Sequence, residues 1–204
     1  DQSLELWITG EDEDFARHLL ESQGYHGKDF LIALVPGAAQ KGKQWPLANF
    51  IDLGSKLIKE YQAWIVVIGG KTDEALGQGL KKGLGEKVID ATGQTTLRQA
   101  AAVLSHCDLY VGNDSGPMHL AAAMQVPVVE ISRFPTGGRP LSPQAPARFE
   151  PWGVPHRVLQ PDRPAPPCHG DSCMAEEAHC IRRITVEQVE IAIADLLRLK
   201  RGIS

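Results

Sequence analysis

Runs of apolar residues alternate with amphipathic stretches along most of the chain, and each change of pattern marks an expected element. Five short runs are largely apolar and show no regular polar alternation: Phe30–Val35, Ala63–Ile68, Val88–Asp90, Asp108–Val111 and Val126–Ile131. Continuous apolar runs of this length are typical of parallel strands that are covered on both faces of a sheet. We therefore expect a sheet of five parallel strands.

Helical patterns fill the stretches between these strands. The expected helices run from about 11 to 24, over Leu47–Tyr61, from Thr72 to about Leu84, over Leu97–Ser105, and through an alanine-rich stretch that ends at Met124. Thr72 and Thr96 are placed as N-caps, because a hydroxyl can accept a hydrogen bond from the free N–H groups of a first turn. Strand and helix alternate through short connections, which predicts a Rossmann-like α/β fold with helices on both faces of a parallel sheet.

The composition of the sequence changes after Ser132. Residues 133–169 carry ten of the fourteen prolines, so we expect an extended arm there rather than a second core. Arg133, Arg139 and Arg148 lie in this arm and are expected to be solvated surface charges. A last amphipathic segment at about 185–199, capped by Thr185, should close the domain as a packing helix.

Loops rich in glycine or lysine follow the expected strands. Four of them, 36–43, 69–73, 93–96 and 112–119, should meet at the carboxyl ends of the strands. In open parallel sheets that edge is where ligands bind. A ligand site is therefore expected at this edge.

The stretch VGNDSGPMHLAAAM, residues 111–124, is the strongest candidate among these loops. Asp114 is placed as the N-cap of the following helix, with Pro117 in its first turn. Free N–H groups and the positive end of the helix dipole then favour a phosphate, beside Ser115, Gly116 and His119. The alternative is that Asp114 only caps the helix and His119 is a half-buried histidine with its hydrogen bonds satisfied.

The loop Pro36–Pro46 carries two lysines, Lys41 and Lys43, among small residues. A lysine in such a loop can reach an anion as a point charge, which favours a phosphate-binding role. The alternative is an ordinary surface loop whose lysines are solvated.

Composition limits the classes of function. The chain has 204 residues, is 43% apolar and carries a net charge of −4. It fits one domain, has no long basic run that would favour nucleic acid, and has no apolar stretch of the roughly 18–20 residues that a membrane span needs. The first residue is Asp1, and the absence of an initiator methionine leads us to expect a piece of a longer protein.

Cysteines cluster near the end of the arm. Cys168, Cys173 and Cys180 lie close to His169 and His179, whereas Cys107 is expected to be a core residue. The spacing does not match a paired C-x2-C zinc pattern. Zinc, a disulfide and reduced thiols all remain open.

Several motifs occur together in a characteristic order. These are PGA and KQWP within Pro36–Pro46, GG at Gly69–Gly70, GQTTL at Gly93–Leu97, NDSGPMHLAAA at Asn113–Ala123, and a P-C, C, C-I-x-x-I-T tail over Pro167–Thr185. Together they resemble the heptosyltransferase family of lipopolysaccharide glycosyltransferases. The resemblance covers nearly the whole chain and identifies it with the C-terminal half of a two-domain GT-B enzyme.

The resemblance implies a function for the whole protein. Heptose is transferred from ADP-heptose to a lipid A–core acceptor with inversion and without a cofactor or bound metal. The acceptor and the general base belong to an N-terminal domain, so this chain would carry no catalytic residue and be inactive alone. The resemblance further implies a cytoplasmic protein that can lie against the inner membrane.

Residue by residue, the resemblance assigns donor contacts to this chain. Lys43 would grip the diphosphate, Thr95 would border the base, and Asp73, or Lys71 in its place, would reach the ribose. Asp114, Ser115, Gly116 and His119 would line the diphosphate and the sugar.

The sequence also departs from the family's pattern. Ala38 and Ala39 stand where hydroxyl residues are common, and Ser132–Pro135 replaces a common F-G turn. The alternatives are half of a GT-B-like nucleotide-sugar epimerase and a non-catalytic nucleotide-binding module.

Overall fold

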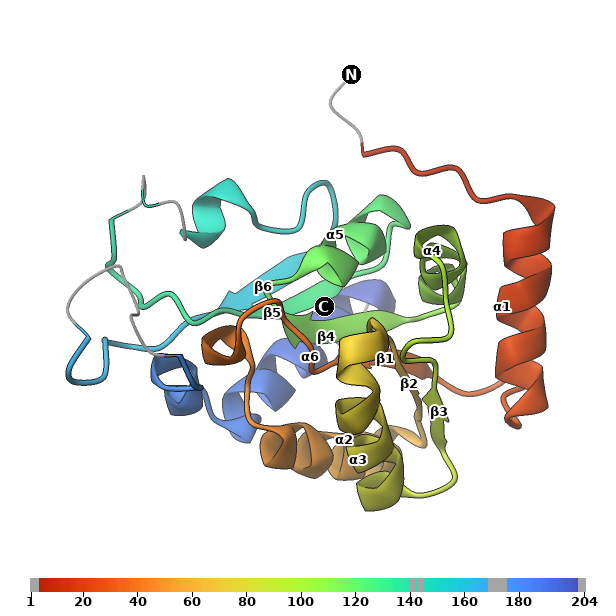
Figure 1. Cartoon of the computed structure of the whole chain (residues 1–204), viewed down its shortest axis with the longest axis horizontal. Coiled ribbons are helices and arrows are strands. Elements are labelled where there is room, and N and C mark those ends of the chain that lie inside the picture. The colour runs from red at the N-terminus through yellow and green to blue at the C-terminus, as the bar shows by residue number, and fades with distance from the viewer. Residues whose placement is uncertain (1–3, 140–141, 143–144, 169–175, 202–204) are drawn as a thin grey trace.

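A computed structural model describes residues 4–139, 142, 145–168 and 176–201 of the chain. Within these residues, six parallel strands form one sheet in the order β3-β2-β1-β4-β5-β6 (Figure 1). The strands are β1 (Leu31–Val35), β2 (Trp64–Val67), β3 (Val88–Asp90), β4 (Leu109–Asn113), β5 (Val128–Ile131) and β6 (His156–Leu159). The strand order reverses between β1 and β4, which places the topological switch point there.

Helices cover both faces of the sheet, as the alternation of patterns predicts. One face packs against α1 (Gly10–Ser22), α4 (Leu97–Ser105) and α5 (Gly116–Ala123). The other packs against α2 (Leu47–Tyr61), α3 (Glu74–Leu84) and α6 (Val186–Arg201) (Figure 1). Short 3-10 turns are η1 (Lys41–Lys43), η2 (Lys71–Asp73), η3 (Pro146–Arg148) and η4 (Cys180–Arg183).

Neighbouring residues of each strand enter opposite core layers. In β1, Ala33 packs on the α4 side while Ile32 and Leu34 pack on the α2 side. All five residues of β1 are buried. This two-sided burial explains why the strands read as unbroken apolar runs.

Two of the three predicted threonine caps are confirmed. Thr96 and Thr185 each form a capping box with the glutamine three residues later. The prediction for Thr72 is wrong. Instead, the Asp73 carboxylate accepts a hydrogen bond from the Gly70 N–H, and α3 begins only after the turn η2.

The proline-rich arm contains a strand that the sequence did not predict. β6 pairs in parallel with β5, with Glu130 opposite Val158. Arg133 lies in the same arm and is only 6% exposed, so its prediction as a solvated charge is wrong, whereas Arg139 and Arg148 are exposed. The arm therefore extends the sheet by one edge strand.

The closing helix and the core cysteine follow the predictions. α6 buries Val189, Ile193 and Leu196 against α2 and the sheet. Cys107 is buried in the opposite core layer. No helix in the described part of the chain is both long and apolar enough to cross a bilayer.

Candidate functional site

The four predicted loops meet at the carboxyl edge of the sheet. Two cavities of about 240 and 190 Å³ lie there, on either side of the start of α5. Both are lined by Gly69, Gly70, Gly116 and Pro117. The first cavity also takes in Thr95–Leu97, and the second takes in Gly37–Ala39 and Asp73. The convergence expected from the order of strands and loops is therefore present.

Lys43 and Asp114 form an ion pair at this edge. The Lys43 Nζ lies 2.7 Å from Asp114 Oδ2, and the two side chains are 24% and 21% exposed. Asp114 directly precedes Ser115, which lines the second cavity. The two loops thus bring one cation and one anion to the start of α5.

Asn113 and Trp45 fix the position of the lysine loop. The buried Asn113 amide donates to the Pro36 carbonyl at 2.8 Å, and its Oδ1 accepts from the Trp45 N–H at 3.0 Å. The Trp45 indole N–H donates to the Ile184 carbonyl at 2.9 Å, and its ring packs edge-on against Phe50. Lys43 therefore stands on a loop that is anchored at both ends.

The start of α5 differs from the prediction in one respect. Asp114 does not cap the helix, because Ser115 is the N-cap residue and α5 begins at Gly116. The Ser115 hydroxyl donates back to the Asn113 carbonyl. The N–H groups of Ser115 and Gly116 make no hydrogen bond to the part of the chain that the structure describes. Two N–H donors without a partner therefore directly follow the residue that pairs with Lys43, and free N–H groups at a helix start favour an anion.

Asp73 closes the turn of its own loop and lies close to Gly37, as well as lining the second cavity. Its carboxylate accepts from the Gly70 N–H at 2.9 Å, and a Cβ added to Gly37 would lie 2.6 Å from it. Since real Cβ atoms do not approach so closely, a larger residue at position 37 would displace the Asp73 carboxylate. Asp73 therefore has a structural task whatever it contributes to a ligand.

The two remaining predicted residues, Thr95 and His119, lie in different places. Thr95 lines the first cavity. His119 lies on α5 and is partly exposed, but it lines neither of the two cavities. The geometry therefore groups Lys43, Asp73, Thr95, Asp114, Ser115 and Gly116 around the start of α5 and leaves His119 at its side.

Glu130 was not among the predicted site residues. It lies in β5, is 1% exposed, and its Oε2 has no hydrogen-bond partner within the described residues. Burial, followed by the negative charges of Asp114 and Glu150, raises the pKa of Glu130 to about 8, while Lys43 acts in the opposite direction. The carboxyl is mainly protonated at pH 7, which lowers the negative charge beside the ion pair. The one signal in the sequence was an acidic residue inside an apolar strand.

Replacing Glu130 with glutamine is expected to remove a pH dependence of stability. An unfolded glutamate titrates near 4.3, whereas the folded Glu130 titrates near 8, so the free energy of unfolding should fall as pH rises between these values. Glu130→Gln should therefore gain on the order of 2–4 kcal/mol over the parent at pH 8 and nothing near pH 4. Urea unfolding at both pH values measures this, with the exposed Glu86→Gln as control. Parallel pH profiles for parent and Glu130→Gln would contradict the buried, protonated state.

One known protein family, and several of its members, are similar to this chain. Residues 5–179 match the model of glycosyltransferase family 9 (heptosyltransferase). Lipooligosaccharide heptosyltransferase 2 of Haemophilus ducreyi is 36% identical over 124 residues, which are 56% of this chain and 35% of that protein. The protein of the same name from Campylobacter jejuni is 26% identical over 174 residues, which are 82% of this chain and 51% of that protein.

Solved structures show the same architecture. The family 9 glycosyltransferase of Veillonella parvula superposes with a TM-score of 0.79 at 26% identity, over 97% of this chain and 54% of that chain. Heptosyltransferase II of Escherichia coli superposes with a TM-score of 0.73 at 24% identity over the same shares, which shows a common fold.

This chain spans about a third to a half of the length of the curated relatives named above. The family match covers most of the chain, and the strand–turn–helix edge with its lysine loop lies inside the matched residues. The chain belongs to glycosyltransferase family 9, the heptosyltransferase family.

Proposed function

We propose that this chain is the donor-binding half of a glycosyltransferase that takes a heptose from ADP-heptose. The observation that carries the proposal is the ion pair of Lys43 with Asp114 directly before the start of α5, at the strand-order reversal, where the N–H groups of Ser115 and Gly116 have no partner among the described residues. A diphosphate there would contact the lysine from one loop and the helix start from another. The two cavities offer space for the base and the sugar on either side.

The chemistry of the transfer suits this arrangement. Breaking the bond between the sugar and the diphosphate leaves negative charge on the leaving group. An ammonium and two oriented N–H groups stabilise such charge as it develops. We propose that this half needs no metal for the transfer. A base from an N-terminal domain would take the proton of an acceptor hydroxyl, whose oxygen attacks the anomeric carbon from the face opposite the leaving diphosphate and so inverts it.

The acceptor and the cellular setting belong to the whole protein. The curated relatives carry the name of lipooligosaccharide heptosyltransferases. On this basis we propose a lipopolysaccharide core acceptor, bound through an N-terminal domain, and a cytoplasmic location against the inner membrane. This half alone would then bind the donor but transfer no sugar.

A ligand panel tests the proposal. Thermal unfolding is followed with ADP, UDP, GDP and their sugar conjugates. We expect ADP to raise the melting temperature more than UDP or GDP, and ADP-heptose to raise it further, because only ligands that prefer the folded state stabilise it. No shift with any nucleotide would overturn the donor role and favour a non-catalytic module, and a preference for UDP-sugars would overturn the ADP assignment.

Replacing Gly116 with alanine should weaken donor binding without harming the fold. A Cβ at Gly116 would meet no atom within 4 Å, so the methyl group would stand in the open space at the start of α5. Intrusion into a well-fitted contact costs about 1–3 kcal/mol. We therefore expect ADP affinity to fall about 5- to 150-fold with an unchanged or slightly higher melting temperature.

Gly10 provides a matched control for this substitution. It is also the first residue of a helix, α1, and a Cβ there also meets nothing within 4 Å. Gly10→Ala should leave ADP affinity unchanged in calorimetry. Equal ADP affinity in Gly116→Ala and Gly10→Ala would remove the start of α5 from the donor site.

A further inference from the structure

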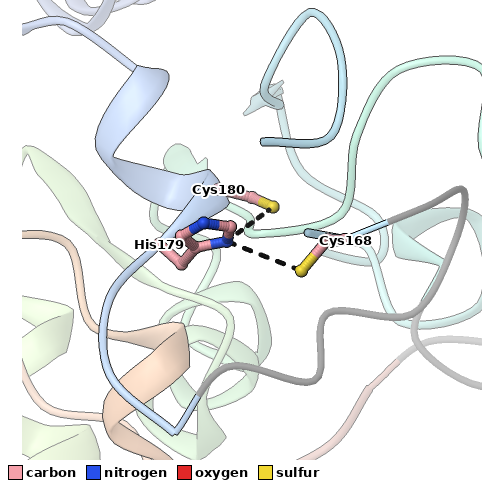
Figure 2. Close-up of side chains that lie close together, drawn as sticks. All are labelled: Cys168, His179 and Cys180. Carbon is pink, nitrogen blue, oxygen red and sulfur yellow. Dashed lines mark hydrogen bonds between the residues drawn. The ribbon is translucent and has the colours of Figure 1, made fainter. Parts of the chain in front are cut away.

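Three potential metal ligands meet where the end of the proline-rich arm passes η4. They are Cys168, His179 and Cys180, and Figure 2 shows both sulfur atoms facing the same ring nitrogen of His179. One Cys ligand comes from the arm, and the other two residues come from the start of η4. None of the three lines the two cavities at the carboxyl edge.

The two nitrogen–sulfur distances fit a tetrahedral zinc site. The His179 Nδ1 lies 3.5 Å from the Cys168 Sγ and 3.5 Å from the Cys180 Sγ. Zinc bonds of about 2.3 Å to sulfur and 2.0–2.1 Å to nitrogen at a tetrahedral angle give a nitrogen–sulfur separation of about 3.5 Å. All three ligand atoms lie within 4.8 Å of one another. Binding of one ion by all three would also place the two sulfur atoms about 3.8 Å from each other.

The hydrogen bond on the far side of His179 orients the ring for metal binding. Its Nε2 lies 2.9 Å from the Pro166 carbonyl oxygen, which can only accept, so Nε2 carries the proton. In the neutral ring, Nδ1 then presents one lone pair to two thiols. A backbone carbonyl is one of the usual partners of the second ring nitrogen in a metal-bound histidine.

The sulfur atoms also have surroundings that suit thiolates. Cys168 and Cys180 are both buried, and neither is in a disulfide. The Ala165 N–H points at the Cys180 Sγ at 3.4 Å. N–H donors of this kind stabilise negative charge on a sulfur ligand. Two buried cysteines and an oriented histidine form a donor set that prefers zinc over hard cations such as Mg²⁺.

We propose that Cys168, His179 and Cys180 bind a structural Zn²⁺ ion, with water or a further ligand in the fourth position. The other clustered residues of the sequence, Cys173 and His169, lie outside the described residues. The ion would join the end of the arm to η4, and thus hold the segment that leads into α6. It would take no part in the glycosyl transfer.

The position of the site connects it to the lysine loop. η4 is followed by Ile184, whose carbonyl accepts from the Trp45 indole N–H. Trp45 lies two residues after Lys43. Loss of the ion should therefore loosen the anchor of the donor loop as well as the arm.

Metal analysis of the full chain tests the proposal. The chain is purified under reducing conditions, loaded with Zn²⁺ and dialysed, and its metal content is measured by mass spectrometry. We expect one zinc per chain, and loss of at least nine tenths of it in Cys180→Ser and in His179→Gln. Cys107 is buried in the core layer beneath α1, α4 and α5, so Cys107→Ala should keep the full zinc content.

Cobalt substitution gives a second measurement that does not depend on how well the variants fold. Co²⁺ added to the metal-free parent chain should give a thiolate-to-cobalt charge-transfer band and intense tetrahedral bands in the visible. No zinc retained by the reduced parent chain, or iron in its place, would overturn the proposal. So would cobalt spectra without a thiolate band, or a Cys168–Cys180 disulfide in protein purified without an added oxidant.

Discussion

Lys43→Ala is expected to weaken ADP binding about 10- to 150-fold, which corresponds to about 1.5–3 kcal/mol for a hydrogen bond to a charged group. The side chain is mostly enclosed, so its charge is less screened by water than that of a surface lysine. Its removal also leaves Asp114 without its cation, and the carboxylate would then repel the diphosphate. Both effects lower the affinity, and calorimetry measures their sum.

Lys41 provides the control in the same turn. It lies two residues before Lys43 and pairs at 3.4 Å with Glu177, where both side chains are 73% exposed. An exposed pair of this kind contributes little. Lys41→Ala should therefore change ADP affinity by less than about twofold. Equal losses in Lys41→Ala and Lys43→Ala would show that the loop acts only through its overall charge, and no loss in either would exclude the loop from the site.

Trp45→Ala is expected to lower the free energy of unfolding by about 3–5 kcal/mol, the usual cost of emptying the place of a large aromatic ring. Trp45 is 1% exposed, and its ring packs against Phe50 between α2 and η4. The substitution also removes the hydrogen bond to the Ile184 carbonyl. ADP affinity should fall with the stability, since Lys43 loses its anchor.

Trp7 allows a matched substitution on the surface. Its side chain is 79% exposed in the stretch before α1. Trp7→Ala should shift the stability by less than about 0.5 kcal/mol. Urea unfolding of the two variants measures the difference. A Trp45→Ala protein as stable as Trp7→Ala would contradict the packing described for the loop.

Most of the fold could be predicted because burial of the strands on both faces of the sheet gives continuous apolar runs in the sequence. Strands such as β1 read as apolar runs, and α2 and α4 have the bounds that their periodicity predicts. β6 was missed since it pairs with one neighbour only and its residues are half-buried. Edge pairing relies on backbone hydrogen bonds, and these leave little trace in the sequence.

The candidate site could be predicted at the level of loops but not of side-chain partners. Connection order alone places the four loops at one edge. The pairing of Lys43 with Asp114, over 71 residues, depends on how α5 begins, and the sequence favoured Asp114 as the cap. Because Ser115 takes the N-cap position instead, the aspartate is free to turn toward the lysine.

Buried charges were the least predictable feature. Glu130 and Arg133 are surface residues by type, yet both are buried, Glu130 in β5 beside β4 and Arg133 in the arm. Burial of an ionisable group depends on tertiary packing and not on local periodicity. The cysteine cluster shows the same limit, since its spacing matches no common zinc pattern, yet the fold brings Cys168, His179 and Cys180 within 4.8 Å of one another.

The position of the diphosphate site is tested most directly by NMR. The chemical shifts of the backbone amides of the isotope-labelled chain are followed while ADP is added. We expect the largest shifts at Ser115 and Gly116 and in the loop around Lys43, with small shifts in α1 and α6. Inorganic pyrophosphate should move the same amides of α5 and leave those near Thr95 unchanged. Large shifts confined to other parts of the chain, or none at saturating ADP, would contradict a donor site at the start of α5.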